Sequence, residues 1–253
     1  MTQQTNNEQL ETLAGQMTLL EHLDEFRRRL IVVSVAVLVT TLLSFAFAQE
    51  LVNWLAYPIG GIQNLQSIDV TENITVFMKV SLMGGMILSM PVILYELIAF
   101  IVPGLTASEK RVLFIAIPAA TILFLSGVAF AYFVMMPRAV PFLMSFLGIR
   151  TAPRPQTYFG FVTRLIFWIG VSFEMPLVMA LLARLGVLSA AFLWKNARYA
   201  VVIIAIAAAL ITPTPDPLNM SLVMAPLLVL YGLGILLAKM MYRPRESSLT
   251  KSD

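Results

Sequence analysis

Long apolar runs recur along the whole chain, and they constrain its fold more than any other feature of the sequence. A bilayer core is about 30 Å thick, so a helix needs about 20 largely apolar residues to cross it. Six runs of roughly this kind cover residues 30–48, 74–102, 112–136, 158–182, 199–211 and 218–241. Apolar residues make up 59% of the 253-residue chain and charged residues 12%, so lipid must be its solvent. The sequence therefore predicts an all-α membrane protein with six transmembrane helices.

Basic residues at the ends of the runs predict the orientation of the helices, because short cytoplasmic loops are enriched in Lys and Arg. The basic residues that would share one side of the membrane are Arg27, Arg28, Arg29, Lys110, Arg111, Arg184, Lys195, Arg198, Arg243, Arg245 and Lys251. The loop 49–73 carries acidic charges only. This pattern places both termini in the cytoplasm of a bacterial inner membrane. The loop 137–157 departs from the pattern, since it places Arg138, Arg150 and Arg154 on the predicted outside.

The fifth run is short, and several runs contain proline. At 1.5 Å per residue, residues 199–211 form a helix of only about 20 Å, which requires snorkelling neighbours or a thinned bilayer. The prolines within or beside the runs include Pro91, Pro118, Pro176 and Pro226. They remove backbone hydrogen bonds and favour kinks. We expect short fifth and sixth helices and a curved, concave bundle.

The length of the chain suits one compact bundle, so we expect a single domain over residues 18–242. Residues 1–17 are polar and read as a disordered cytoplasmic tail, and residues 243–253 as a second cytoplasmic tail.

Several chemistries have no support in the sequence. The chain contains no cysteine and a single histidine, His22, which excludes disulfides and multi-histidine metal sites. It also lacks the GxxxxGK[ST], HExxH and GxSxG motifs of nucleotide-binding, metalloprotease and hydrolase sites. Its basic residues are scattered at membrane boundaries, so we predict no nucleic-acid binding. We also predict no enzyme activity, cofactor or metal.

The segment 18–30 is amphipathic. Thr18 and Glu21 fit a capping box, and leucines with Phe26 recur at helical spacing on one face. We expect a helix on the cytoplasmic membrane surface that runs into the first span. The arginines can be explained as topology anchors alone, but anchoring does not require Glu25 beside an anionic surface.

Two further glutamates are candidates. Ser108 and Glu109 suit the first turn of a helix, which by itself accounts for Glu109. Glu174 lies deep in the fourth run, where a charge is costly, and such residues are functional by default. The alternative is a structural partner for it, such as Arg164. Lys79 and Glu96 lie near run ends, where their side chains can snorkel.

Several ordered motifs resemble one family, the TatC subunit of the twin-arginine protein translocase. They are LEHLDEFRRRL (20–30), PVILYELIAFIVP (91–103) with EKR (109–111), FAYF (130–133), GVSFEMP (170–176) and LITP (210–213) with Asp216. The resemblance extends over residues 19–242, nearly the whole chain.

The resemblance implies a receptor for signal peptides with two consecutive arginines, which helps to move folded proteins across the membrane with the proton-motive force. Glu25 and Glu109 fall on the family's two signal-binding carboxylates. Arg27 and Phe100 fall on the same surface. Glu96 departs from the family, where many members have glutamine.

Other positions gain an expected role from the resemblance. Pro58 and Asp216 match positions in the periplasmic loops, and Glu174 matches a buried polar residue proposed to draw water inward. The family's last two spans contact single-span TatA and TatB partners in a multi-copy complex, so Thr212 is a candidate contact. Met220 stands where a polar glutamine is common, which places partner contacts there in doubt.

Two other functional classes stay open. A small-solute or ion transporter could use Glu174 as its ion site and would produce flux in liposomes from this chain alone. An intramembrane enzyme would turn over a lipid or peptide, and the missing nucleophile–base pair counts against it.

Overall fold

The computed structural model describes residues 19–101, 107–145, 152–212 and 217–242, and every regular element within these ranges is helical. The elements are α2 (Leu19–Ala46), α3 (Ala48–Ala56), η1 (Tyr57–Ile59), η2 (Ile62–Asn64), α4 (Glu72–Ile101), α5 (Ala107–Phe130), η4 (Ala131–Met135), α6 (Met136–Ser145), α7 (Pro155–Ser172), α8 (Met175–Arg184), α9 (Ala190–Lys195), α10 (Ala197–Ile211) and α11 (Pro217–Met241).

Five helical stretches in the described ranges are long and apolar enough to cross a membrane. They are His22–Ala46, Glu72–Phe100, Phe114–Ser145, Pro155–Arg184 and Met220–Met241. The chain is therefore a membrane protein with an all-helical fold.

Of the two helices predicted to be short, only the fifth span is short in the structure. Helix α10 has 15 residues and is as short as its run predicted. The expectation of a short sixth helix is wrong, because α11 has 25 residues. Pro226 lies inside α11 but does not end it, and the helix continues through the apolar residues on both sides of the proline.

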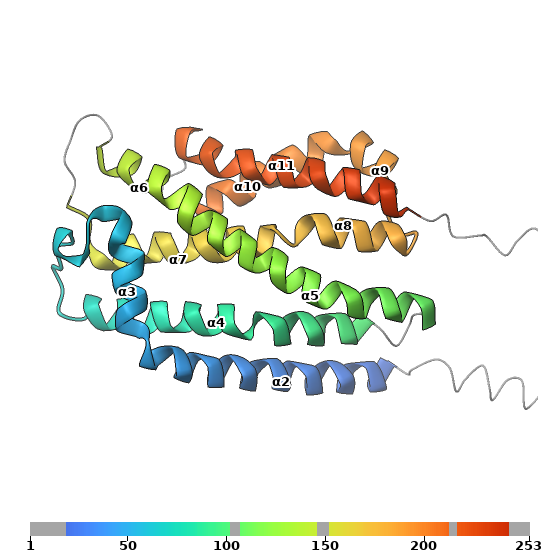
Figure 1. The fold of residues 1–253 in the computed structure, drawn as a ribbon, viewed down its shortest axis with the longest axis horizontal. Helices are drawn as coiled ribbons and strands as arrows, with labels where there is room; N and C mark the ends of the chain where they lie inside the picture. Colours follow the sequence, from blue (N-terminus) through green and yellow to red (C-terminus); the bar gives the residue numbers. More distant parts are fainter. Residues whose placement is uncertain (1–18, 102–106, 146–151, 213–216, 243–253) are drawn as a thin grey trace, which may run out of the picture.

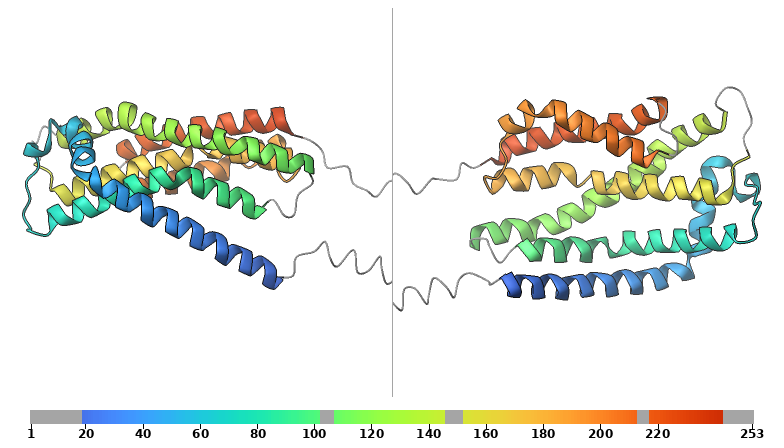
Figure 2. Two further views of the ribbon diagram at one scale, coloured as in Figure 1. Left: turned by 60° about the horizontal axis from the view of Figure 1, so that its bottom comes forward. Right: turned by 180° about the vertical axis from the view of Figure 1, so that it is seen from behind.

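The long helices lie side by side, and the chain begins and ends at the same end of the bundle (Figure 1). Helix α2 starts and α11 finishes at this end, which we call the terminal end. Helix α3 and the segment after it lie at the opposite end, which we call the α3 end (Figures 1 and 2). Toward the terminal end, α2 slants away from α5 (Figure 2, left), while its side chains stay in contact with α4.

The amphipathic segment runs directly into the first span, as the sequence predicts. Helix α2 is continuous from Leu19 to Ala46, because no glycine or proline interrupts these 28 residues. The polar residues near its start therefore extend the first span. Helix α3 lies in a stretch where the sequence predicted a loop, and it buries Ala48, Leu55 and Ala56.

The third and fourth spans each contain an irregular turn. Five residues of π-helix, η4, separate α5 from α6. The fourth span breaks after Ser172, and α8 begins at Met175 with Pro176 in its first turn. Proline lacks the N–H that a continuous helix needs, which explains the break.

Helix α7 forms the centre of the bundle, with Phe159, Val162, Leu165 and Ile169 almost fully buried. Glycine allows its close approach to α5, since a Cβ added at Gly127 would lie 2.9 Å from the Cα of Gly170. By contrast, α2 and α10 expose large apolar side chains, as expected for helices with lipid around them.

Candidate functional site

Three charged side chains from α2 and α4 meet at the terminal end. The Arg29 Nε donates to Glu25 Oε1 over 3.0 Å, and its Nη1 donates to Glu96 Oε2 over 2.9 Å. The guanidinium of Arg29 therefore joins two carboxylates that are 71 positions apart in the chain (96 − 25 = 71). We call Glu25, Arg29 and Glu96 the charged triad.

The charged triad is partly buried, and it contains two carboxylates but only one cation. Side-chain exposure is 16% for Glu25, 24% for Arg29 and 13% for Glu96. Two carboxylates and one guanidinium leave a net charge of −1. The second oxygen of Glu25, Oε2, is buried and accepts no hydrogen bond from any described residue. A buried charged oxygen without a donor is costly, so the site is suited to one further cationic donor.

Aromatic rings lie beside the charged triad. Phe100 stacks on His22 with 4.4 Å between ring centroids, and Phe26 meets the edge of Phe100 at 5.6 Å. These contacts fix α2 against α4 one turn beyond the carboxylates. Phe100 thus packs on His22 and Phe26, which lie on α2 close in sequence to Glu25.

Arg27 and Glu109 are the other residues predicted for this surface. Arg27 is exposed on α2, and within the described ranges it forms no ion pair. Glu109 belongs to the first turn of α5, and its side chain lies outside the described residues.

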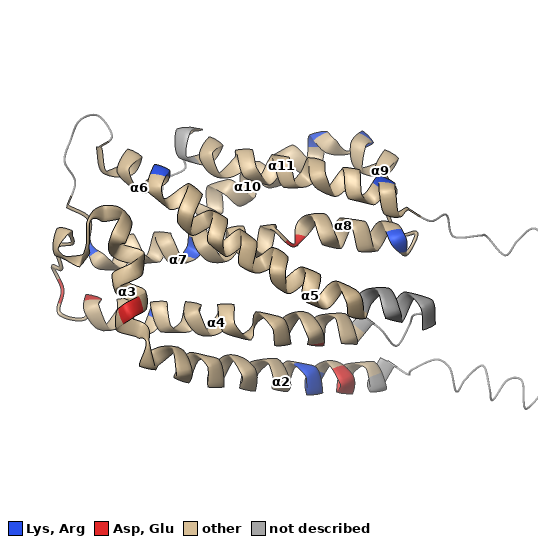
Figure 3. Ribbon diagram, viewed as in Figure 1, with Lys and Arg blue, Asp and Glu red and all other residues tan. Residues whose placement is uncertain are grey.

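Glu174 lies at the break between α7 and α8, where Figure 3 shows an acidic position in the middle of the bundle. Its side chain is buried, and Oε1 has no hydrogen-bond partner among the described residues. Arg164, the partner that the sequence offered, instead donates to the Leu210 carbonyl over 3.4 Å. Glu174 is therefore a buried carboxylate without an ion-pair partner among the described residues.

An ion pair between the buried Glu72 and the exposed Arg154 at the α3 end was not predicted. Glu72 is 1% exposed, and Arg154 Nε donates to its Oε1 over 2.6 Å. The pair joins the start of α4 to the start of α7 and neutralises one basic residue of the loop that departed from the positive-inside pattern. A second, Arg138, donates to the Val134 carbonyl of its own helix, and Arg150 lies outside the described residues.

Two tyrosines hold α3 in place. Tyr158 Oη donates to the Leu55 carbonyl over 2.7 Å, and Tyr132 Oη donates to the Trp54 carbonyl over 3.0 Å. Pro58 follows in η1, half-buried, and Gly60 ends this turn with a positive φ of 82°. Asp216, the other predicted loop residue, lies outside the described residues.

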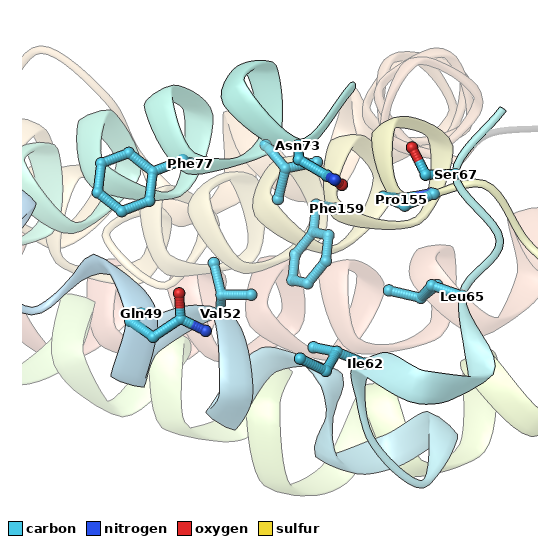
Figure 4. A pocket seen from close by; sticks show the side chains of 10 residues that line it. Gln49, Val52, Ile62, Leu65, Ser67, Asn73, Phe77, Pro155 and Phe159 are labelled. Atoms are coloured by element: carbon cyan, nitrogen blue, oxygen red, sulfur yellow. The ribbon is translucent and has the colours of Figure 1, made fainter. Parts of the chain in front are cut away.

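A cavity of about 440 Å³ opens between α3, α4 and α7 at this end (Figure 4). The amides of Gln49 and Asn73 share its wall with apolar side chains such as Val52, Phe77 and Phe159. Its lining contains no charged side chain, and no group of three or more His, Asp or Glu that could hold a metal occurs in the described part of the chain.

The two predicted partner-contact residues lie close together in the chain but in different environments. Thr212 ends α10, is buried, and donates its hydroxyl to the Ala208 carbonyl over 3.1 Å. Met220 is half-buried in the first turns of α11. Thr212 thus has its hydrogen bond within its own helix.

Comparison with known proteins identifies the family. The model of the family "Sec-independent protein translocase protein (TatC)" matches residues 21–226. The Sec-independent protein translocase protein TatC of Carboxydothermus hydrogenoformans is 34% identical, over 92% of this chain and 96% of that protein. TatCy of Bacillus subtilis is 36% identical, over 92% of this chain and 93% of its own length.

A solved structure has the same fold. The crystal structure of the twin-arginine translocase receptor TatC superposes with a TM-score of 0.78 at 34% sequence identity. The superposition covers 88% of this chain and all of that one. The chain belongs to the TatC family of Sec-independent protein translocase proteins.

Proposed function

We propose that this protein is the receptor component of a twin-arginine translocation system, and that its charged triad binds one arginine of the signal peptide. The family is one of protein translocase components and not of enzymes. The observation that carries the proposal is the buried Glu25 Oε2, which has no donor within the described ranges although it lies beside Arg29.

The chemistry of guanidinium and carboxylate supports this role. A guanidinium presents parallel N–H donors that match a carboxylate, and an ammonium cannot reproduce this geometry. Oε1 of Glu25 already accepts from Arg29, so an incoming arginine would use Oε2. Its positive charge would neutralise the net charge of −1. One such hydrogen bond contributes roughly 1.5–3 kcal/mol.

A second carboxylate is needed for the second arginine of the signal, and we assign Glu109 to it. Arg27, which is exposed, and Phe100, which packs beside the triad, complete the proposed signal-binding surface. The apolar part of the signal would then follow the concave side of the helices toward the membrane interior.

We further propose one domain over residues 18–242 with six spans, with the tails 1–17 and 243–253 in the cytoplasm of a bacterial inner membrane. Both the basic flanks and the shared terminal end of α2 and α11 support this topology. In this orientation Pro58 and Asp216 belong to periplasmic loops.

The remaining proposals concern assembly and transport. Thr212 and Met220 mark the surface for TatA-like and TatB-like single-span partners in a multi-copy complex, and the proton-motive force supplies the energy. The 15 residues of α10 reach only about 22 Å, and together with the buried Glu174 this supports local thinning of the bilayer.

Signal-peptide binding to the detergent-purified chain tests the proposal. A twin-arginine peptide is compared with its twin-lysine version on wild type and on the double variant Glu25→Gln, Glu109→Gln. We expect wild type to prefer arginine and the double variant to lose that preference. The exposed Glu50→Gln on α3 is the matched control and should bind as wild type does.

Equal binding of both peptides by wild type would refute the receptor site. In that case Glu174 favours the transporter alternative, since it is a buried carboxylate with no cation beside it in the described structure. Ion flux into liposomes that contain this chain alone would then be measured on wild type and Glu174→Gln.

A further inference from the structure

Two cations lie inside the predicted membrane region and line the same cavity. Lys79 on α4 and Arg164 on α7 face a cavity of about 270 Å³ between these helices. The Lys79 ammonium lies over Gly160, 3.9 Å from where a Cβ would stand on that residue. Gly160 and Arg164 are one helical turn apart, so both charges lie on one face of α7. Figure 3 shows basic positions on both helices in the half of the bundle that contains α3.

Neither cation has a carboxylate partner among the residues that the structure describes. The ion pairs within the described ranges involve Arg29 and Arg154 only. Arg164 reaches just a backbone carbonyl, that of Leu210, over 3.4 Å. Both side chains are exposed on the surface of spans. Two like charges that share one cavity in a low-dielectric region repel each other, and an anion between them removes that cost.

Both residues lie close enough to the membrane interface for their long side chains to reach lipid phosphates by snorkelling. Helix α4 has 30 residues, or about 45 Å, and so exceeds a bilayer core of about 30 Å by about 7 Å at each end. Lys79 lies 7 residues into α4, and Arg164 lies 9 residues into α7, which begins at the same end of the bundle. These positions correspond to about 10 and 14 Å from the helix starts. Both cations therefore lie a few ångströms inside the core boundary next to the α3 end.

Deeper in the membrane, the same cavity becomes apolar. Its remaining lining beyond Lys79 on α4 is Leu82, Met83 and Met86, and Phe167 follows Arg164 on α7. Two cations just below the headgroup region, with apolar side chains deeper in the cavity, match the phosphate and the acyl chain of a phospholipid. Flexible methionines and an aromatic ring suit an acyl chain, which has no fixed shape.

We propose that Lys79 and Arg164 bind the phosphate of an anionic phospholipid from the leaflet next to the α3 end, with an acyl chain along Met83, Met86 and Phe167. The cavity is separate from the charged triad, and the proposal does not depend on signal binding.

The test is native mass spectrometry of the full detergent-purified chain, titrated with phosphatidylglycerol, phosphatidylcholine or inorganic phosphate. We expect phosphatidylglycerol to bind most tightly. Lys79→Gln and Arg164→Gln should each weaken it about tenfold, and the double variant about a hundredfold. Lys79→Arg, which keeps the charge, should retain binding. Gly160→Leu keeps both cations but fills the cavity, and should lose the lipid.

Arg138→Gln serves as the matched control, because Arg138 is an exposed cation of the same end that bonds only its own helix carbonyl. Unchanged lipid binding by the double variant, with Arg138→Gln as reference, would overturn the proposal. Displacement of the lipid by inorganic phosphate at equal concentration would also overturn it, since the ligand would then be a free anion.

Discussion

The charged triad predicts that Glu96→Gln will weaken signal binding although Glu96 need not touch the signal. In the structure Arg29 divides its donors between Glu25 and Glu96. Glutamine keeps the size of the side chain and removes its charge, so the net charge of the triad rises from −1 to 0. Arg29 then has a single carboxylate left to neutralise. An arginine of the signal must therefore compete with Arg29 for Glu25.

The size of the effect follows from what Arg29 would otherwise give to Glu96. A hydrogen bond between charged groups contributes roughly 1.5–3 kcal/mol, and 1.4 kcal/mol is a factor of ten in affinity. The side chains are partly buried, with 13% exposure for Glu96, so solvent screens the pair only in part. We expect Glu96→Gln to bind a twin-arginine peptide at least about tenfold more weakly than wild type.

A double variant separates charge from packing. Arg29→Gln added to Glu96→Gln returns the net charge to −1 and frees Glu25, so most of the lost affinity should return. Binding is measured by fluorescence anisotropy of a labelled peptide at two salt concentrations, because the electrostatic part weakens as salt rises. If the double variant binds as weakly as Glu96→Gln alone, competition by Arg29 is not the cause and the reasoning fails.

Three further predictions concern stability and the buried carboxylates. Arg154→Ala leaves the buried Glu72 without its cation and should lower the free energy of unfolding in detergent by about 1–3 kcal/mol, below the value for a fully buried pair because solvent screens the exposed Arg154, whereas Arg138→Ala should change it hardly at all; equal effects would contradict the role of the pair. Tyr158→Phe removes the donor to the Leu55 carbonyl and should cost about 1 kcal/mol, a shift in Tm of about 2–4 °C, and an unchanged Tm would show that α3 does not depend on it. Glu174→Leu removes a buried carboxylate whose Oε1 has no hydrogen-bond partner among the described residues, and should raise Tm while it abolishes export of a twin-arginine cargo by membrane vesicles; a lower Tm would reveal a stabilising contact of Glu174.

The sequence predicted the long helices well because hydrophobic length is a local property. The runs at 74–102 and 218–241 correspond closely to α4 and α11. The sequence did not predict helix α3, because this helix has only nine residues, several of them polar, and contains no long apolar run. The break at Pro176 was foreseeable as a kink from the missing N–H.

The charged triad combines one contact that the sequence can predict with one that it cannot. Glu25 and Arg29 are four residues apart, a spacing that pairs opposite charges on a helix and could have been read. The partner of Arg29 in α4 lies 67 residues away, and that of Arg154 lies 82 residues away. No local sequence pattern encodes such long separations, so the sequence alone predicts neither ion pair between helices.

The π-helix between α5 and α6 sets the rotational phase of the third span. A π-turn accommodates one residue more than an α-turn, and one residue in an α-helix corresponds to a rotation of about 100°. The buried positions Met136, Ala139 and Val140 face the core only because η4 precedes them. An unbroken α-helix through all five residues 131–135 would turn α6 by about 100°, whereas deletion of one of them would restore an α-helix and leave the orientation of α6 unchanged.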